Sequence, residues 1–155
     1  MPLYRVQSKR HLPASRGIFR NPYADRERLP RDTNPDLHRT FGQWFQGRFG
    51  VDYRRRGLIC TGSLDVAQGY LTVSSALIEV APVGSYSLCF SPKCFDLYGH
   101  FQFGGRNLPE NLDEVPAEME SLDYIQFVDA GLDIAADSGQ EVMIYAEYFS
   151  YQVIS

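Results

Sequence analysis

The sequence predicts an α+β protein in which helices come early and strands dominate late. The 155 residues fit one domain. Hydrophobic residues make up 44% of them, which is enough to bury a core. Segments with helical and with alternating periodicity follow one another, and no internal repeat is visible. We therefore expect a single domain over residues 1–155.

The first segment predicts a strand followed by irregular structure. Residues 2–7 place Leu3 and Arg5 on one face and Tyr4 and Val6 on the other, which is typical of a short strand. Residues 8–33 contain prolines among many arginines and show no stable period. We expect an ordered loop with one short helix there.

A helix is predicted to begin at Asn34. Asn34 suits the capping position, Pro35 the first helical position, and Asp36 the positive end of the helix. An apolar stripe follows at helical spacing, formed by Leu37, Phe41, Trp44 and Phe45. We expect Trp44 to pack in the core, and Gly47 and Gly50 to end the helix.

The middle of the chain reads as alternating short elements. Residues 57–61 predict an apolar strand, and Ser63 is placed to cap a helix that runs to about Leu71. Residues 75–80 and 85–90 predict two strands joined by residues 81–84. A short strand or turn is expected over residues 95–103, with Gly104 and Gly105 breaking it.

The C-terminal part predicts an acidic helix and then strand structure. Apolar residues at helical spacing over residues 110–130 indicate a helix whose acidic face lies in water. Residues 140–154 alternate weakly and are rich in aromatic and β-branched residues. They predict either one long strand or a hairpin.

Charge is distributed unevenly along the chain. Residues 1–56 hold 13 of the 15 Lys and Arg but 5 of the 19 Asp and Glu, and residues 57–155 hold the rest. Such asymmetry indicates a polyanionic ligand or two faces that attract each other. It argues against a uniformly basic nucleic-acid coat protein. Within the basic half, residues 54–56 are interpreted as a solvated charge run, with a phosphate or nucleic-acid contact as the alternative.

Several classes of protein are disfavoured. No run is apolar enough for a membrane span, and the N-terminal residues lack the apolar stretch of a secretory signal. We expect cytoplasmic synthesis, and export without a signal peptide stays open. The three cysteines and three histidines match no disulfide scaffold or metal-ligand spacing. Phosphate-binding loops and a nucleophile elbow are missing from the sequence.

Three pieces of sequence remain that suit chemistry. Arg5 lies within the first strand, and a guanidinium there suits a bidentate grip on phosphate or carboxylate. Residues 60–63 place small hydroxyl side chains where a strand turns into a helix, which favours an anion. Glu141 enters an apolar strand, where a partly desolvated carboxylate suits a sugar hydroxyl or a developing cation.

This trio, in this order, resembles the Arg–Ser/Thr–Glu class of mono-ADP-ribosyltransferases, the cholera-toxin-like branch. The resemblance rests on Leu3-Tyr4-Arg5, on residues 60–63 with the helix that follows, and on Gln140-Glu141-Val142. It implies two small antiparallel or mixed sheets that form a cleft, with helices packed on one side. It also implies NAD as the substrate and a bacterial toxin or effector as the context, with an immunity or target protein as partner.

The resemblance assigns a role to each motif. Arg5 would hold the NAD phosphates or the nicotinamide ribose, and Thr61 would support the nicotinamide site and orient the glutamate. Glu141 would bind the ribose 2′-hydroxyl and stabilise the oxocarbenium-like transition state. The NAD-binding residues implied in this way are Tyr4, Arg5, Cys60, Thr61, Gly62, Ser63 and Tyr70.

The sequence departs from the family pattern in two places. Residues 60–62 read Cys-Thr-Gly where the family has Ser-Thr-Ser, and Gly139 stands where arginine-modifying members carry a glutamate. The ADP-ribose acceptor therefore stays open between a protein side chain, a nucleic acid, a small molecule and water, and water would make the protein an NAD glycohydrolase. Glu147 stays open as the catalytic residue in place of Glu141.

Two other functions stay open. One is a related family of NAD-degrading toxins, which also has Leu-Tyr-Arg-Val near its N-terminus but expects a glutamate after Ala67, where this chain has Gln68. The other is a non-enzymatic immunity or adaptor protein that docks through its oppositely charged faces. The transferase hypothesis requires Arg5, Thr61 and Glu141 to converge on one cleft.

Overall fold

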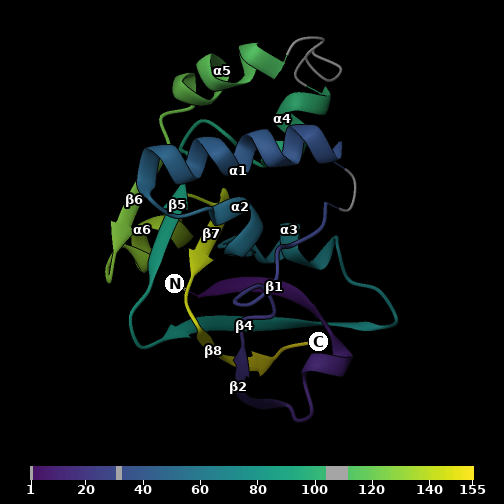
Figure 1. Cartoon of the computed structure of the whole chain (residues 1–155). Helices are drawn as coiled ribbons and strands as arrows, with labels where there is room; N and C mark the ends of the chain where they lie inside the picture. The colour runs from purple at the N-terminus through teal and green to yellow at the C-terminus, as the bar shows by residue number, and fades with distance from the viewer. Residues whose placement is uncertain (1, 31–32, 104–111) are drawn as a thin grey trace.

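The strands of the protein form one antiparallel sheet in the computed structural model, which describes residues 2–30, 33–103 and 112–155. Eight strands are hydrogen-bonded in the order β2-β8-β4-β1-β3-β7-β5-β6 (Figure 1). Their bounds are β1 Leu3–Ser8, β2 Arg16–Arg20, β3 Leu58–Thr61, β4 Ser75–Val83, β5 Ser87–Phe90, β6 Ile125–Val128, β7 Glu141–Tyr145 and β8 Tyr148–Val153. Together with the helices, this sheet confirms the α+β class.

The sheet consists of two halves joined by a narrow connection. β1 and β4 are aligned over six residue pairs, from Leu3 with Val80 to Ser8 with Ser75, whereas β1 meets β3 only at Tyr4 and Thr61. Figure 1 shows β1 and β4 running across the direction of β5, β6 and β7. The expectation of two separate small sheets is therefore wrong, because this single pairing makes the sheet continuous.

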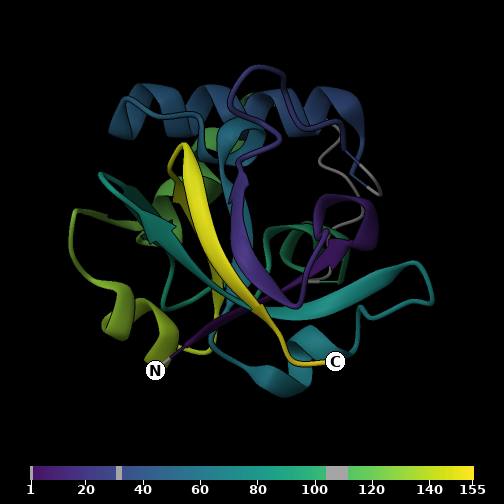
Figure 2. The same cartoon turned by 90° about the horizontal axis from the view of Figure 1, so that it is seen from below.

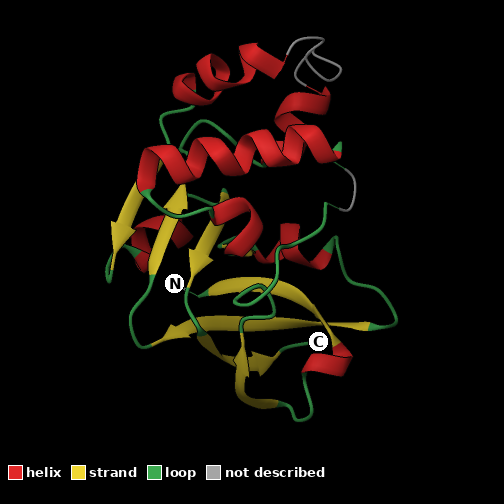
Figure 3. Cartoon of the chain, viewed as in Figure 1, coloured by secondary structure: helices red, strands yellow, loops and turns green. Residues whose placement is uncertain are grey.

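Helices cover both faces of the β3-β7-β5-β6 half. The α-helices are α1 Pro35–Phe49, α2 Tyr53–Arg56, α3 Leu64–Gln68, α4 Leu97–Phe103, α5 Val115–Ser121 and α6 Leu132–Asp137, and the 3₁₀ helices are η1 Lys9–His11 and η2 Leu112–Glu114. Helices α1, α4 and α5 gather at the top of the molecule (Figure 3) and contribute to one core cluster, while α6 contributes to the other. Helices packed on one side only were expected, and that expectation is wrong.

The side chains of β5 and β7 explain why both faces are covered. Cys89 and Met143 enter the cluster beneath α1, whereas their neighbours Leu88 and Val142 enter the cluster that contains α6. Successive residues of a strand point to opposite faces, so a strand whose residues are all apolar must be buried on both. β5 is buried at each of its four positions.

The α1 helix forms as its capping signals predict. The Asn34 Oδ1 accepts hydrogen bonds from the backbone N–H groups of Asp36 at 2.9 Å and Leu37 at 3.3 Å. Gly50 ends the helix with a φ of 76°, a left-handed conformation that glycine adopts without strain. Gly47 lies inside the helix, so its expected role as a terminator is wrong. Trp44 packs against the core as expected, and its ring lies 5.2 Å from that of Phe45.

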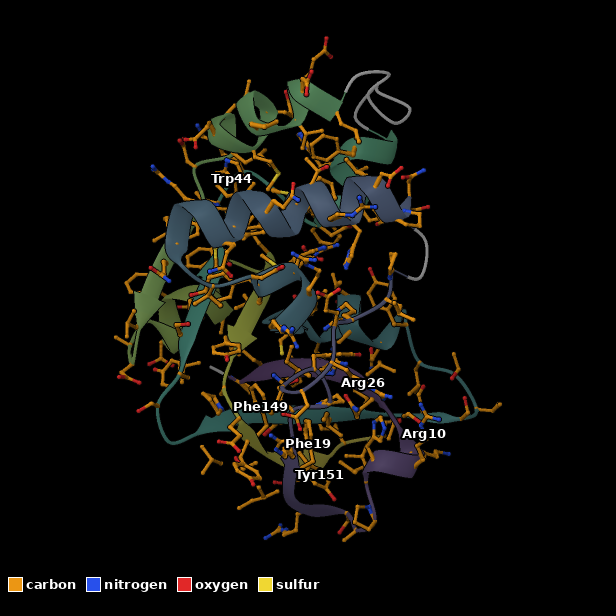
Figure 4. All side chains as sticks on the ribbon, viewed as in Figure 1. Arg10, Phe19, Arg26, Trp44, Phe149 and Tyr151 are labelled. Atoms are coloured by element: carbon orange, nitrogen blue, oxygen red, sulfur yellow. The ribbon has the colours of Figure 1, made fainter. Side chains whose placement is uncertain are left out.

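The β1-β4-β8-β2 half of the sheet contains a strand that the sequence pattern did not indicate. β2 pairs along its whole length with β8, and Figure 2 shows the two strands side by side. Phe19 of β2 stacks on Phe149 and tilts against Tyr151, with ring centroids 5.8 Å apart in both pairs (Figure 4). The predicted loop over residues 8–33 is therefore wrong at β2, because this strand is stabilised by a partner more than a hundred residues away in sequence.

Three later segments also differ from the predictions. Residues 97–103 form α4 rather than a strand or turn, and Gly104 and Gly105 lie outside the described residues. The predicted helix over 110–130 is wrong in extent, because α5 ends at Ser121, Asp123 adopts a φ of 54°, and β6 follows. Residues 110 and 111 lie outside the described residues.

The C-terminal segment is neither one strand nor a hairpin. β7 pairs with β3 and β5 in one half of the sheet, whereas β8 pairs with β4 and β2 in the other. The chain crosses between the halves at Ala146 and Glu147. This crossing ties the two halves together and leaves Glu141 at the start of β7, near the junction of β1 and β3.

Candidate functional site

A cavity of about 510 Å³ lies where the two halves of the sheet meet. One wall comes from β1, β3 and the start of β7, and we call it the sheet wall. A second wall comes from Tyr23, Arg28, Leu29 and Pro30, and we call the loop of residues 23–30 that carries them the loop wall. Side chains of α3 and of the segment that leads into α4 also line the cavity, together with Thr33, His38, Arg54 and Tyr70. A volume of this size is typical of small-molecule sites.

The structure brings together the three residues that the sequence singled out. Arg5, Thr61 and Glu141 all line this cavity. Their proximity follows from strand register, because Thr61 is aligned with Tyr4 on one side and with Glu141 on the other. Tyr4, Thr61 and Glu141 thus form one row across three adjacent strands, and Arg5 follows Tyr4 on β1 and lines the same cavity.

Glu141 is held in place by two hydrogen bonds to the same oxygen. Its Oε1 accepts from Nη1 of Arg54 at 2.9 Å and from the backbone N–H of Leu97 at 3.3 Å. The Glu141 backbone N–H donates to the carbonyl of Phe95 at 2.8 Å. Within the described residues, Oε2 accepts no hydrogen bond. The carboxylate is therefore fixed through one oxygen and presents the other to the cavity.

Arg54 is the partner that sequence reasoning missed. The side chains of Arg54 and Glu141 are only 7% and 12% exposed, so this ion pair is buried. Arg54 belongs to the short helix α2, which Asp52 caps by accepting a hydrogen bond from the Arg55 N–H at 3.0 Å. The interpretation of residues 54–56 as a solvated charge run is therefore wrong for Arg54, which points inward while Arg55 pairs with Asp52 and Glu27.

Thr61 and its neighbours play separate roles. The Thr61 hydroxyl accepts from the Ser63 N–H at 3.1 Å and donates to the carbonyl of Gly139 at 3.4 Å, so it ties β3 to the start of β7. Ser63 caps α3 by accepting from the Val66 N–H at 3.3 Å and is not among the cavity-lining residues. Gly62 does not line the cavity either, because it packs against the backbone of Ala136.

Cys60 and Tyr70 line the cavity but differ in environment. Burial raises the pKa of the Cys60 thiol to about 12, so the thiol stays protonated at neutral pH and is not a nucleophile. Tyr70 is 59% exposed and lies at the rim. Burial, and then the charges of Asp96 and Glu141, raise its pKa.

Arg5 spans the gap between the two halves of the sheet. Its Nη1 donates to the carbonyl of Ile59 on β3 at 2.8 Å, and its Nε donates to Oε1 of Gln7 at 2.6 Å. Both acceptors are neutral. The guanidinium is therefore oriented without being neutralised, which suits it to an anionic ligand.

The loop wall is anchored by Asn21, which is 1% exposed. The Asn21 Nδ2 donates to the carbonyls of Arg56 at 2.9 Å and Ala146 at 3.1 Å, and its Oδ1 accepts from the Tyr23 N–H at 2.9 Å. The Arg28 N–H donates to the carbonyl of Arg55 at 2.8 Å. An ordered loop was expected here, but no sequence signal marked it as part of the site, because its partners lie on elements distant in the chain.

Glu147 lies away from the cavity. It occupies the crossing between β7 and β8, its side chain is 62% exposed, and its nearest charged partner is Arg20 at 3.5 Å. It is not a lining residue. Of the two glutamates that the sequence left open, only Glu141 thus faces the candidate site.

No protein-family pattern, curated protein or solved structure matches this chain. Among the described residues, no helix is long and apolar enough to cross a membrane. The same residues contain no cluster of three or more His, Cys, Asp or Glu side chains placed to hold a metal ion. The function of the site is therefore inferred from its own residues and geometry.

Proposed function

We propose that this protein cleaves the nicotinamide–ribose bond of NAD, as a mono-ADP-ribosyltransferase or an NAD glycohydrolase of a bacterial toxin or effector. The observation that carries the proposal is the convergence of Arg5, Thr61 and Glu141 on one cavity. Arg5, which has no carboxylate partner among the described residues, suits the negative phosphates of NAD. Glu141, which is held through one carboxylate oxygen, suits the ribose carbon that becomes positive as the bond breaks.

Glu141 supplies the stabilisation of positive charge. As the bond between ribose C1′ and the nicotinamide nitrogen breaks, its electron pair leaves with nicotinamide and the ribose ring becomes cationic. A fixed carboxylate close to that ring lowers the energy of the transition state more than that of the ground state. Glu141 Oε2, which accepts no hydrogen bond from the described residues, is available for the ribose 2′-hydroxyl.

Arg54 acts through Glu141 rather than on the substrate. By binding Oε1, it fixes the rotamer of the glutamate in a site where the family pattern would place a further hydroxyl and this chain has Cys60. Thr61 fixes the backbone at the start of β7 through Gly139. These two contacts orient the carboxylate before the substrate arrives.

The acceptor completes the reaction. Its lone pair forms the new bond to C1′, and it loses a proton to solvent when it is water or a hydroxyl. Gly139, two residues before Glu141, has a φ of 68° and no side chain to contact an acceptor. Water can act as the acceptor without a binding site of its own on the protein. We therefore expect nicotinamide release in buffer alone.

The first prediction tests this function through a matched pair of glutamates. Incubation of the purified protein with NAD is expected to release nicotinamide, measured by liquid chromatography. Glu141→Gln keeps an oxygen for Arg54 and Leu97 but removes the negative charge, and should lower the rate by about 100-fold or more. Glu147→Gln is the control and should leave the rate unchanged, because Glu147 lies outside the cavity.

Two results would contradict the proposal. One is a wild-type protein that releases no nicotinamide. The other is a Glu141→Gln protein that remains as active as the wild type while its melting temperature shows that it is folded. A rate that rises only when protein or nucleic acid is added would place the activity with transferases, whereas an unchanged rate would place it with glycohydrolases.

A further inference from the structure

The loop wall of the cavity contains an arginine that neither the sequence motifs nor the resemblance indicated. Arg28 lines the cavity together with Arg5. Among the described residues, neither of these two guanidiniums forms an ion pair with a carboxylate. Arg54, the third arginine of the lining, is already paired with Glu141.

The position of Arg28 is fixed by neutral groups. Its Nη2 donates to the carbonyl of Gly57 at 2.7 Å, and its guanidinium carbon lies 4.2 Å from the centre of the Tyr23 ring. Stacking of this kind holds an arginine in place and leaves its charge available. The side chain is therefore preorganised although no anion accompanies it.

Arg28 is incompletely satisfied in the protein without ligand. Its Nε is buried and has no hydrogen-bond partner among the described residues. Burial first, and then the nearby charges of Arg5 and Arg54, lower the pKa of Arg28 to about 10. Buried donors without partners and repelling cations both raise the energy of the empty site. An anion bound beside Arg28 would remove much of this cost.

Each of the two arginines also has a nitrogen to offer. Within the described part of the chain, Nη1 of Arg28 and Nη2 of Arg5 have no protein acceptor, and neither atom is among the buried unpartnered groups. The lining carboxylate other than Glu141 belongs to Asp96, whose Oδ1 accepts from the Gly99 N–H at 2.5 Å at the start of α4 and which forms no ion pair within the described residues. Two positive charges thus remain for a ligand.

We infer that Arg28 is a ligand-binding residue that acts with Arg5, and that the ligand carries a diphosphate diester. Two guanidiniums match two phosphates that carry one negative charge each. A triphosphate carries more charge than this wall neutralises. The inference rests on the proposed function for the identity of the site, but it concerns binding and not bond cleavage.

The second prediction tests binding without turnover. The probes are ADP-ribose, which has the diphosphate but no nicotinamide, and adenosine, which has no phosphate, with affinities measured by isothermal titration calorimetry. ADP-ribose should bind at least tenfold more tightly than adenosine and more tightly than ATP. Arg28→Gln should weaken ADP-ribose binding by about tenfold or more, as expected for a lost charge-assisted hydrogen bond, and leave adenosine binding unchanged.

Arg26 provides the matched control. It lies two residues away on the same loop, is exposed, and is not a cavity-lining residue (Figure 4). Arg26→Gln removes the same charge from the protein but should change ADP-ribose affinity less than twofold. An equal loss in both variants would mean that only net charge matters and would overturn the inference, as would unchanged affinity in a folded Arg28→Gln protein.

The outcomes separate this inference from the proposed function. Arg28-dependent binding of ADP-ribose by a protein that releases no nicotinamide would support the inference and contradict the proposed function. Nicotinamide release by a protein whose ADP-ribose affinity is insensitive to Arg28 would do the reverse. Preference for ATP over ADP-ribose would contradict the diphosphate assignment.

Discussion

The α2 helix and the loop wall each contribute an arginine to the cavity, and the two arginines are held in opposite ways. Arg54, on α2, is paired with Glu141 and held by a capped helix. Arg28, on the loop wall, is oriented by a carbonyl and an aromatic ring and has no carboxylate partner. The paired arginine positions a protein group, whereas the unpaired one is available to a ligand. The charge that a site offers to a ligand therefore depends less on how many arginines it contains than on which of them already have a carboxylate partner.

The third prediction removes the arginine that is paired with Glu141 and has the largest expected effect on stability. Arg54→Ala leaves Glu141 buried without its counter-charge, which should lower the free energy of unfolding by about 3–5 kcal/mol. Urea denaturation measures this value. The double variant Arg54→Met with Glu141→Gln removes both charges and should recover most of the loss, because no unpaired charge remains.

Equal destabilisation in the single and double variants would contradict this account. It would show that Arg54 contributes through packing and not through its pairing with Glu141. The sulfur of Met143, 4.0 Å from Nη1 of Arg54, is the contact that such packing would involve.

The fourth prediction tests how tightly the sheet wall is packed. A Cβ at Gly62 would lie 1.8 Å from the carbonyl oxygen of Ala136, so Gly62→Ala must displace the turn after β3 from α6. We expect a loss of about 3 kcal/mol, the upper part of the range for overpacking. Gly47→Ala is the matched control, because a Cβ there meets nothing within 4 Å in a helix.

The control should change stability in the opposite direction. Alanine in place of an exposed helical glycine stabilises a helix by about 0.5–1 kcal/mol. Thermal denaturation of both variants gives the comparison. A Gly62→Ala protein as stable as the wild type would mean that the sheet wall adjusts easily, and the rigid positioning of Thr61 would then be wrong.

The fifth prediction concerns pH and has the smallest expected effect. Burial first, and then the charge of Arg54, lower the pKa of His38 below its usual 6.5, and its Nε2 lies 3.1 Å from the carbonyl oxygen of Arg28. Because the folded-state pKa is below the unfolded one, His38 contributes its full stability above about pH 6.5. That contribution is lost as the pH falls toward the lowered pKa.

Urea denaturation at pH 7.5 and 5.5 measures this dependence. His38→Gln should reduce the loss of stability on acidification, whereas His11→Gln gives the separate contribution of His11, whose pKa burial and nearby arginines also lower. An unchanged pH dependence in His38→Gln would show that Arg54 and Arg28 do not act on this histidine.

Local sequence patterns predicted the elements whose signals lie within a few neighbouring residues. The α1 helix follows from Asn34, Pro35 and Gly50, which act on neighbouring backbone groups. β1, β3 and the start of β7 follow from short apolar or alternating runs, and Arg5, Thr61 and Glu141 were singled out on those runs. Their placement in one cavity agrees with the order of the motifs, although the roles assigned to them stay predictions.

Tertiary structure decided what depends on distant partners. β2 and β6 are strands because β8 and β5 pair with them, not because of their own composition. Arg54 was interpreted as solvated because a run of three arginines is normally exposed, and its partner Glu141 lies 87 residues away.

The same division applies to the cavity as a whole. By itself the sequence determined the chemistry available, a basic N-terminal part and one glutamate entering an apolar strand. Only the fold decided which charges meet, since the crossing of the chain between β7 and β8 brings the two halves of the sheet together around them. Burial then made one arginine a partner of Glu141 and left another without a counter-charge, and no local pattern encodes that difference.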